Sequence, residues 1–196
     1  MILSILIPTV PNREARFNRL WAELRDQKHR LETVHPTLPK VEILHDNSPR
    51  YVDGGLTVGK KREALVQRAE GKYVCFVDDD DWVSPNYLET LVRACMEGRH
   101  VVTFNALFKC DGYWALVDMD LNHENEQATP ERIVKRGVWH ICPILTEIAQ
   151  AVGFPDINNA EDSAWLSKLN ITNQYKVNHI LYQYNHSASV SEVDRI

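Results

Sequence analysis

The sequence predicts a single α/β domain with a mostly parallel central sheet flanked by helices. Over residues 1–105, β-rich apolar runs alternate with segments of helical periodicity, and this alternation is typical of a parallel sheet. The 196 residues suit one domain with a sizeable core, and no stretch has the composition of a linker. We therefore expect residues 1–196 to form one domain, in which residues 106–196 pack on the same sheet.

The first strand and helix follow from local pattern. Ile2–Ile7 is a continuous apolar run that ends at Pro8, as in a strand buried on both faces. From Glu14 onward, apolar residues recur at helical spacing and predict a helix of about four turns. Pro36 and Pro39 prevent that helix from continuing, because proline lacks the amide hydrogen and clashes with the preceding turn.

The next elements alternate in the same way. Val41–Leu44 is a short strand followed by a turn cluster, and a charged helix is expected around Lys60–Ala69. Tyr73–Val77 is a third strand. Ser84-Pro85 supplies an N-cap and a first-turn proline for the helix that follows, and Val101–Phe104 is a fourth strand.

The second half of the chain is less regular. We expect strands at Tyr113–Met119 and Ile180–Tyr184, and a short helix that starts at Thr129-Pro130. Further helices are expected within Cys142–Val152 and at Glu161–Leu169.

Composition and charge argue against several classes of protein. There are 22 Lys and Arg against 27 Asp and Glu, a net charge of −5, whereas nucleic-acid binding draws on clustered basic residues. The apolar N-terminus follows no basic residue, and no apolar run reaches the ~20 residues of a bilayer span, so we expect neither a signal peptide nor a membrane span. The four cysteines form no CxxC pair, and we interpret them as buried small side chains of a cytoplasmic protein.

Four consecutive carboxylates, Asp78–Asp81, directly follow the third predicted strand. They would repel one another unless positive charge held them, and the carboxyl ends of strands form the crevice where α/β sheets bind ligands. If the chain stays extended, Asp78 and Asp80 point the same way and offer oxygen ligands to Mg²⁺ or Mn²⁺, which in turn binds a diphosphate. The alternative is a solvated acidic turn, in which Asp81 caps the next helix.

Three segments resemble family 2 glycosyltransferases of the GT-A fold: Ser4–Thr9, Gly59–Leu65 and Ala69–Pro85. The resemblance implies a GT-A-like domain, with a nucleotide-sugar-binding half at residues 1–105 and an acceptor-side half at 106–196. It implies a metal-dependent glycosyltransferase that moves a sugar from a nucleoside-diphosphate donor, most simply a UDP-sugar, to a hydroxyl acceptor with inversion. The acceptor would be a glycan or another hydroxyl compound, and a modified DNA base stays open.

The resemblance also implies the residues of the donor site. The nucleotide-sugar is expected on six residues, namely Pro8, Thr9, Asp46, Arg62, Asp78 and Asp79. Mn²⁺ or Mg²⁺ is expected on three side chains, namely Asp78, Asp80 and His186, the last from a C-terminal aromatic strand followed by His and serines.

A later block, Gly153–Pro155 followed by Glu161–Leu166, resembles the segment of the family that carries the catalytic base. Sugar transfer with inversion requires a carboxylate that takes the proton of the acceptor hydroxyl. Asp162 is the expected base, with Glu161 as the second candidate; the alternative is a plain helix start that satisfies free N–H groups. Trp139 and His140 precede an apolar run and are candidates for the acceptor side.

The sequence also departs from the family and leaves other functions open. Asn47 stands where the family often has an acid, and Glu63 where it has Asn, so the nucleotide is not fixed. Gly54–Lys61 approaches the phosphate loop of nucleotide triphosphatases, but Lys61 lacks the hydroxyl that the motif requires. A sugar-phosphate nucleotidyltransferase usually has a glycine-rich basic segment after its first strand, and Pro11–Arg13 has no glycine. A binding-only module of the same fold is the remaining alternative.

Overall fold

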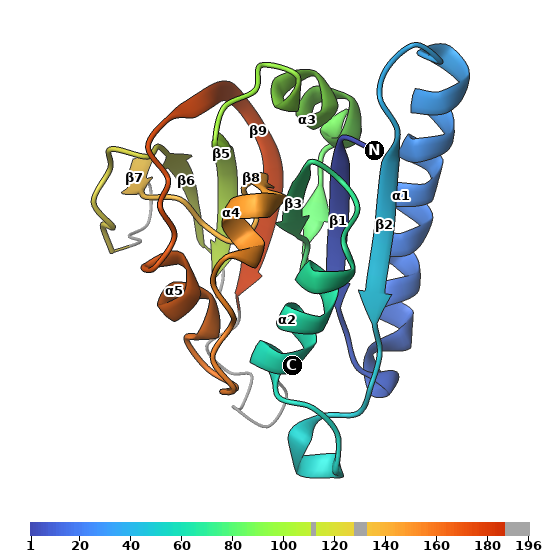
Figure 1. The fold of residues 1–196 in the computed structure, drawn as a ribbon, viewed down its shortest axis with the longest axis vertical. Helices are drawn as coiled ribbons and strands as arrows, with labels where there is room; N and C mark the ends of the chain where they lie inside the picture. The colour runs from blue at the N-terminus through green and yellow to red at the C-terminus, as the bar shows by residue number, and fades with distance from the viewer. Residues whose placement is uncertain (111–112, 128–132, 187–196) are drawn as a thin grey trace.

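Three parallel strands form the N-terminal part of one mixed sheet in the computed structural model, which describes residues 1–110, 113–127 and 133–186 (Figure 1). β1 (Leu3–Pro8) lies between β2 (Val41–Asp46) and β3 (Tyr73–Phe76) and pairs in parallel with both. All six residues of β1 are buried, because helices cover both faces of the sheet. The first predicted strands are therefore confirmed.

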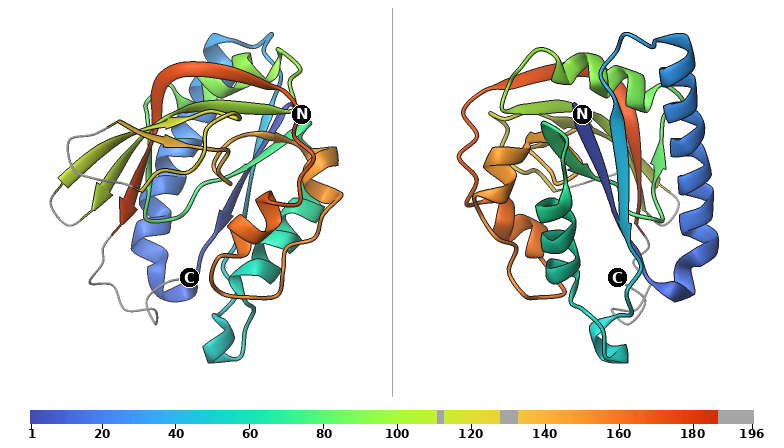
Figure 2. Two further views of the ribbon diagram at one scale, coloured as in Figure 1. Left: turned by 90° about the vertical axis from the view of Figure 1, so that its left-hand side faces the viewer. Right: turned by 45° about the vertical axis from the view of Figure 1, so that its right-hand side comes forward.

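Different sets of helices cover the two faces of the sheet (Figure 2). α1 (Glu14–Val34) and α3 (Tyr87–Cys95) pack together on one face. α2 (Val58–Arg68), α4 (Thr146–Gln150) and α5 (Glu161–Leu166) lie on the other, where α2 contacts both α4 and α5. None of the helices in the described ranges is long and apolar enough to cross a membrane.

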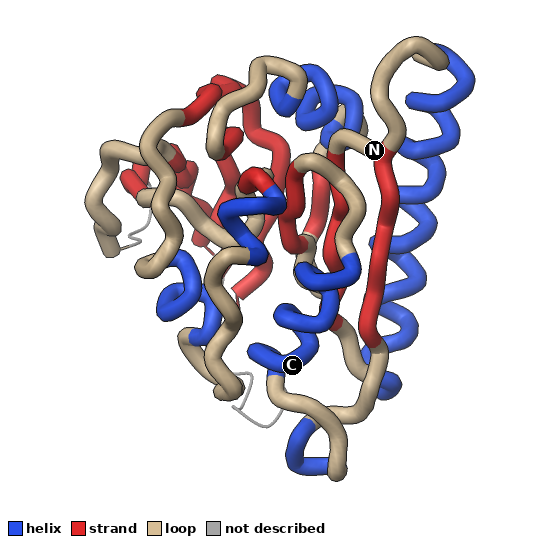
Figure 3. The backbone as a smooth tube through the Cα atoms, viewed as in Figure 1, coloured by secondary structure: helices blue, strands red, loops and turns tan. Residues whose placement is uncertain are grey.

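The second half extends the same sheet with mainly antiparallel pairs. The strands of both halves are drawn in red in Figure 3. The strand order is β2-β1-β3-β8-β5-β6-β7, and β9 lies beside β5 and pairs with β4. The strands involved are β4 (Trp82–Val83), β5 (Val101–Cys110), β6 (Tyr113–Met119), β7 (Ile133–Arg136), β8 (Ile144–Leu145) and β9 (Gln174–His186). Two short 3₁₀ turns, Pro11–Arg13 and Tyr51–Asp53, follow β1 and β2.

The helix on the first face is longer than its apolar pattern predicts. α1 has 21 residues, and its buried side includes Gln27, whose amide donates to the carbonyl of Ser84 and accepts the N–H of Leu88. These hydrogen bonds let a polar residue occupy a core position. The other helix on this face, α3, begins at Tyr87 and not directly after Ser84-Pro85. The intervening residues form a turn, in which the Ser84 carbonyl accepts the Tyr87 amide.

Of the helices expected in the second half of the chain, one is shorter than expected and another lies outside the described residues. Cys142–Val152 is not one helix: Ile144 and Leu145 form β8 between β3 and β5, and only Thr146–Gln150 is helical. The helix expected at Thr129-Pro130 lies outside the described residues. Cys75, Cys95 and Cys142 are buried free thiols, as expected.

An aromatic cluster positions α5 against the end of β3. Phe154 and Trp165 stack with ring centroids 4.4 Å apart, and Phe76 meets both edge-on at 5.6 and 6.3 Å. The Trp165 indole nitrogen donates to the Val152 carbonyl at 3.0 Å, so the buried ring is also satisfied. This packing brings the start of α5 next to the residues that follow β3.

Candidate active site

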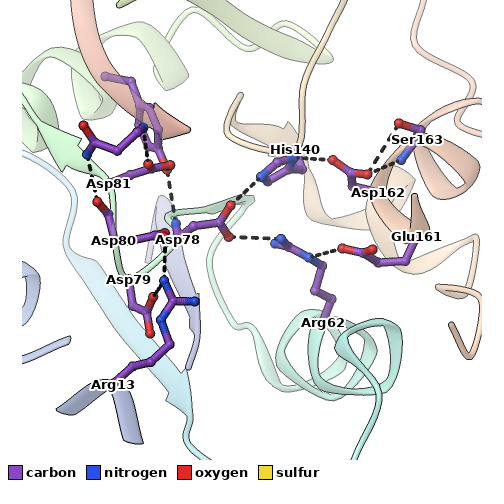
Figure 4. A network of polar contacts seen from close by, with 12 residues as sticks. Arg13, Arg62, Asp78, Asp79, Asp80, Asp81, His140, Glu161, Asp162 and Ser163 are labelled. Atoms are coloured by element: carbon purple, nitrogen blue, oxygen red, sulfur yellow. Dashed lines mark hydrogen bonds and ion pairs between the residues drawn. The ribbon is translucent and has the colours of Figure 1, made fainter. Parts of the chain in front are cut away.

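The four consecutive aspartates leave the end of β3 and diverge. The Asp81 amide donates to the Asp78 carbonyl at 3.1 Å, so the chain turns over Asp79 and Asp80. The expectation of an extended segment with Asp78 and Asp80 pointing the same way is therefore wrong. Opposite charges hold three of the four carboxylates: Arg62 and His140 contact Asp78, and Arg13 contacts both Asp79 and Asp80 (Figure 4).

Two cations join Asp78 to the first turn of α5. Arg62 Nη2 lies 3.0 Å from Asp78 Oδ1, and Arg62 Nε lies 3.0 Å from Glu161 Oε1. His140 Nε2 lies 3.2 Å from Asp78 Oδ2, and His140 Nδ1 lies 2.8 Å from Asp162 Oδ2. Burial raises the pKa of Asp78, but Arg62 and His140 outweigh it and hold this pKa well below its usual range.

Asp79 is fully buried and organises the residues that follow β1. It accepts a hydrogen bond from Thr9 Oγ1 at 2.5 Å, and Arg13 Nη2 lies 3.0 Å from its Oδ1. The same Arg13 nitrogen lies 2.5 Å from Asp80 Oδ2, and Arg16 lies 3.7 Å from that oxygen. Burial raises the pKa of Asp79 to about 6, against the opposing effects of Arg13 and Thr9.

Asp81 is held by β9 and not by the N-terminus of a helix, so its expected capping role is wrong. Tyr182 donates its hydroxyl to Asp81 Oδ2 at 2.7 Å, and the Asn185 amide donates to Oδ1 at 2.7 Å. The Tyr182 hydroxyl also accepts the Asp78 amide at 3.1 Å, and the Asn185 side chain donates to the Asp80 carbonyl. Burial, followed by the charges of Asp78 and Asp80, raises the pKa of Asp81 well above its usual value.

The ends of β1 and β2 bring the expected nucleoside residues together. Pro8 pairs in register with Asp46, and the Thr9 amide donates to the Asp46 carbonyl at 2.8 Å. Lys61 is buried beneath them and donates to the carbonyls of Thr9 (2.7 Å) and Ser48 (2.5 Å). This lysine therefore holds together the segments that follow β1 and β2.

The resemblance to a phosphate loop is not supported by the geometry. Lys61 is already occupied by backbone carbonyls, and Lys60 pairs with Asp156 at 2.9 Å. Thr57 caps α2 by accepting the Lys60 amide, so this segment is an ordinary helix start. A Cβ on Gly59 would lie 1.8 Å from the Pro155 carbonyl oxygen, so close packing explains this glycine.

The two acidic residues at the start of α5 have different environments. Glu161 is buried on Arg62, whereas the Asp162 side chain is 26 % exposed. Asp162 accepts the Ser163 amide at 2.7 Å in addition to its contact with His140. Burial raises the pKa of Asp162, but His140 outweighs it and holds this pKa well below its usual range, so the carboxylate is ionised and reachable.

A cavity of about 300 Å³ lies beside this helix. Its lining includes Trp139 and Leu121, together with Ser163 and Leu166 of α5 and Ser167, which directly follows that helix. Ser163, the residue that follows Asp162 in the chain, is among the residues that line the cavity. The expectation that Trp139 lies on the acceptor side is compatible with this position.

The described residues include some of the oxygen ligands that a divalent metal ion requires. Within residues 1–110, 113–127 and 133–186, no group of three or more His, Cys, Asp and Glu is arranged to hold an ion. Asp80 presents a carboxylate that is 34 % exposed, and Asp78 lies nearby with both oxygens on cations. Two carboxylates fit Mg²⁺ or Mn²⁺ when substrate oxygens and water complete the shell. The side chain of His186 lies outside the described part.

Sequence reasoning included Arg62 in the site but missed the pairing of two other cations, Arg13 and His140, with the aspartates. Arg13 follows β1 and His140 precedes β8, far in sequence from the residues that they contact. His140 was expected on the acceptor side, yet it is buried between Asp78 and Asp162. Ion-pair partners on different elements have no local spacing rule, so no sequence signal could have found them.

We expect the metal-free protein to become less stable as the pH rises from about 6.5 to about 9. Burial and Arg62 lower the pKa of His140, but Asp78 and Asp162 outweigh them and raise it to about 9. An unfolded histidine titrates near ~6.5, so the stabilisation is complete below that pH and is lost as the pH rises through about 9. The difference corresponds to about 3 kcal/mol. Denaturant unfolding across this range measures it, and His140→Gln should flatten the decline.

Comparisons with known proteins agree with this architecture. Residues 51–146 match the model of glycosyl transferase family 2. A curated relative named as a glycosyltransferase, EpsH of Bacillus subtilis (strain 168), is 24% identical over 78 residues, which are 40% of this chain and 23% of EpsH. The family match thus covers 96 of the 196 residues, just under half of the chain, and shows that this part of the chain is similar to family 2 glycosyltransferases.

Solved structures show the same fold. TarS 1–349 of S. aureus superimposes with a TM-score of 0.63 at 18% identity, covering 94% of this chain and 60% of TarS 1–349. The structure of TarS 1–349 in complex with UDP-GlcNAc gives a TM-score of 0.64 at 17% identity, covering 100% of this chain and 62% of the other. The fold is therefore GT-A-like. The chain spans about 60% of the length of TarS 1–349 and 23% of EpsH.

Proposed function

We propose that the chain transfers a sugar from a nucleoside-diphosphate donor to a hydroxyl acceptor, with Asp162 as base and with inversion. One observation carries the proposal: the ionised, partly exposed Asp162 is joined through His140 to Asp78, which lies just beyond the carboxyl end of β3. The family match supports the enzyme class over the nucleotidyltransferase alternative. UDP is the favoured nucleotide, since TarS has been crystallised with UDP-GlcNAc.

The donor would lie along the ends of β1, β2 and β3. Asp46 would hold the nucleoside beside Pro8 and Thr9, and Asp78 the ribose. Arg62 Nη1 is buried and has no hydrogen-bond partner among the described residues, which supports a contact with the diphosphate. Asp80, with Asp78, would hold Mn²⁺ or Mg²⁺, and the bound metal would neutralise charge on the departing diphosphate.

The transfer itself needs one proton acceptor. The acceptor oxygen forms a bond to the anomeric carbon while the bond from that carbon to the phosphate oxygen breaks and its electron pair leaves on the diphosphate. Asp162 takes the hydroxyl proton as the new bond forms. We favour a glycan acceptor, because Trp139, Ser163 and Ser167 are among the residues that line the cavity beside α5.

Thermal unfolding with UDP, GDP, CDP and dTDP, each with and without Mn²⁺, tests the donor site. A nucleotide at ~100 times its Kd adds about 2.7 kcal/mol and raises the Tm by several degrees. A shift with UDP that requires Mn²⁺ supports the proposal, and no shift with any nucleotide contradicts it. A shift without turnover on any glycan would favour the binding-only module.

Asp80→Asn should abolish the part of the UDP shift that depends on Mn²⁺, because an amide is a weaker ligand than a carboxylate for a hard cation. The same thermal measurement checks this. Asp26→Asn is the matched control, since Asp26 is an exposed aspartate paired with Arg30 on α1. An unchanged Mn²⁺ effect in Asp80→Asn would remove Asp80 from the metal site.

A further inference from the structure

The first turn of α5 has little local support of its own. The helix has six residues and no side-chain cap, and it follows Ala160, whose φ of 58° is unfavourable for a residue with a Cβ. Trp165 and Glu161 anchor its buried side. Asp162 lies beside that anchored side and is partly exposed, so apolar packing does not fix its carboxylate.

His140 contacts the Asp162 carboxylate, which the packing of α5 does not fix. Its ring is 7 % exposed, and its carbonyl accepts the amide of Phe76 at 3.1 Å, which ties it to the end of β3. The same strand leads directly into Asp78, and the ring spans from Asp78 Oδ2 to Asp162 Oδ2. The backbone of β3 therefore sets the positions of the donor carboxylate and, through one rigid imidazole, of the carboxylate on α5.

We propose that His140 is a positioning residue that aims Asp162 at the acceptor hydroxyl by fixing its carboxylate relative to Asp78. This inference rests on the proposed function. His140 is not itself the base, because each ring nitrogen already faces a carboxylate oxygen (Figure 4). Its role is to preorganise a group that reacts, as supporting residues do in well-ordered active sites.

His140→Ala and His140→Gln test this role. Misplacement of a reacting group by about 1 Å costs on the order of 100-fold in rate, so His140→Ala should lower kcat by about 10- to 100-fold. The affinity for UDP, measured by calorimetry, should change much less, since Arg62 still holds Asp78. Glutamine keeps one side-chain donor, and His140→Gln should recover part of kcat.

His35→Ala is the matched control. His35 directly follows α1 and pairs with Glu89 at 3.3 Å. The end of α1 lies at the opposite end of the molecule from the carboxyl ends of β1 and β2 (Figure 1). This variant should leave kcat unchanged. A purely structural role for His140 would lower the Tm of His140→Ala without changing kcat, and that result would overturn the inference.

Crystal structures of His140→Ala and His140→Gln give a readout that does not depend on turnover. We expect the Asp162 carboxylate to leave its position in the alanine variant and to keep it in the glutamine variant. An unmoved carboxylate in His140→Ala would overturn the inference even if no acceptor were found. If the wild-type protein itself neither bound UDP nor transferred a sugar, that result would instead contradict the proposed function.

Discussion

Asp162→Asn is expected to lower kcat by about 10²- to 10⁴-fold while leaving donor affinity nearly intact. The amide cannot take the proton of the acceptor hydroxyl, yet it keeps the size of the side chain and an oxygen that can accept from Ser163. The substitution therefore weakens the stabilisation of the transition state and not that of the ground-state complex with the donor. Steady-state kinetics with a UDP-sugar and Mn²⁺, together with calorimetry of UDP binding, separate the two effects.

Asp156→Asn provides the control for that experiment. Asp156 lies five residues before α5, is exposed, and pairs with Lys60 and Thr57 away from the four aspartates. We expect its kcat to match the wild-type value. If Asp162→Asn lost UDP binding in proportion to its loss of kcat, Asp162 would belong to the donor site and the assignment of the base would be wrong.

Arg62→Met is expected to lower the free energy of unfolding by about 3–5 kcal/mol, or roughly 6–20 °C in Tm. The guanidinium is buried and is ion-paired with both Asp78 and Glu161. It also lies 4.6 Å from the centre of the Phe76 ring. Methionine fills much of the volume but leaves two buried carboxylates without this partner, and an uncompensated buried charge is costly. Urea unfolding measures the change.

Arg30→Met is the control for Arg62→Met, because Arg30 makes exposed ion pairs on α1 that are worth less than about 1 kcal/mol each. The triple variant with Asp78→Asn and Glu161→Gln should recover part of the stability lost in Arg62→Met, since it removes the stranded charges. A loss below about 1 kcal/mol in Arg62→Met would show that water compensates the two carboxylates.

Local pattern alone predicted much of the framework. The apolar runs that became β1 and β3 and the strand Tyr113–Met119 came directly from hydrophobic periodicity. Periodicity also placed the aspartate run at the end of a strand and a helix at Glu161–Leu169, whereas the acidic pair was singled out by the resemblance to family 2 glycosyltransferases. Periodicity and turn chemistry act between neighbours in the chain, so the sequence is sufficient for these features.

The tertiary structure decided which groups meet. The chain turns between Asp78 and Asp81, and the Tyr182 hydroxyl on β9 donates to Asp81. His140 lies between the carboxylates of Asp78 and Asp162. Within Cys142–Val152, the first part forms a strand and not a helix, because it pairs with β3 on one side and with β5 on the other. Such contacts join segments up to a hundred residues apart, and their geometry follows from packing and charge compensation, which no local spacing encodes.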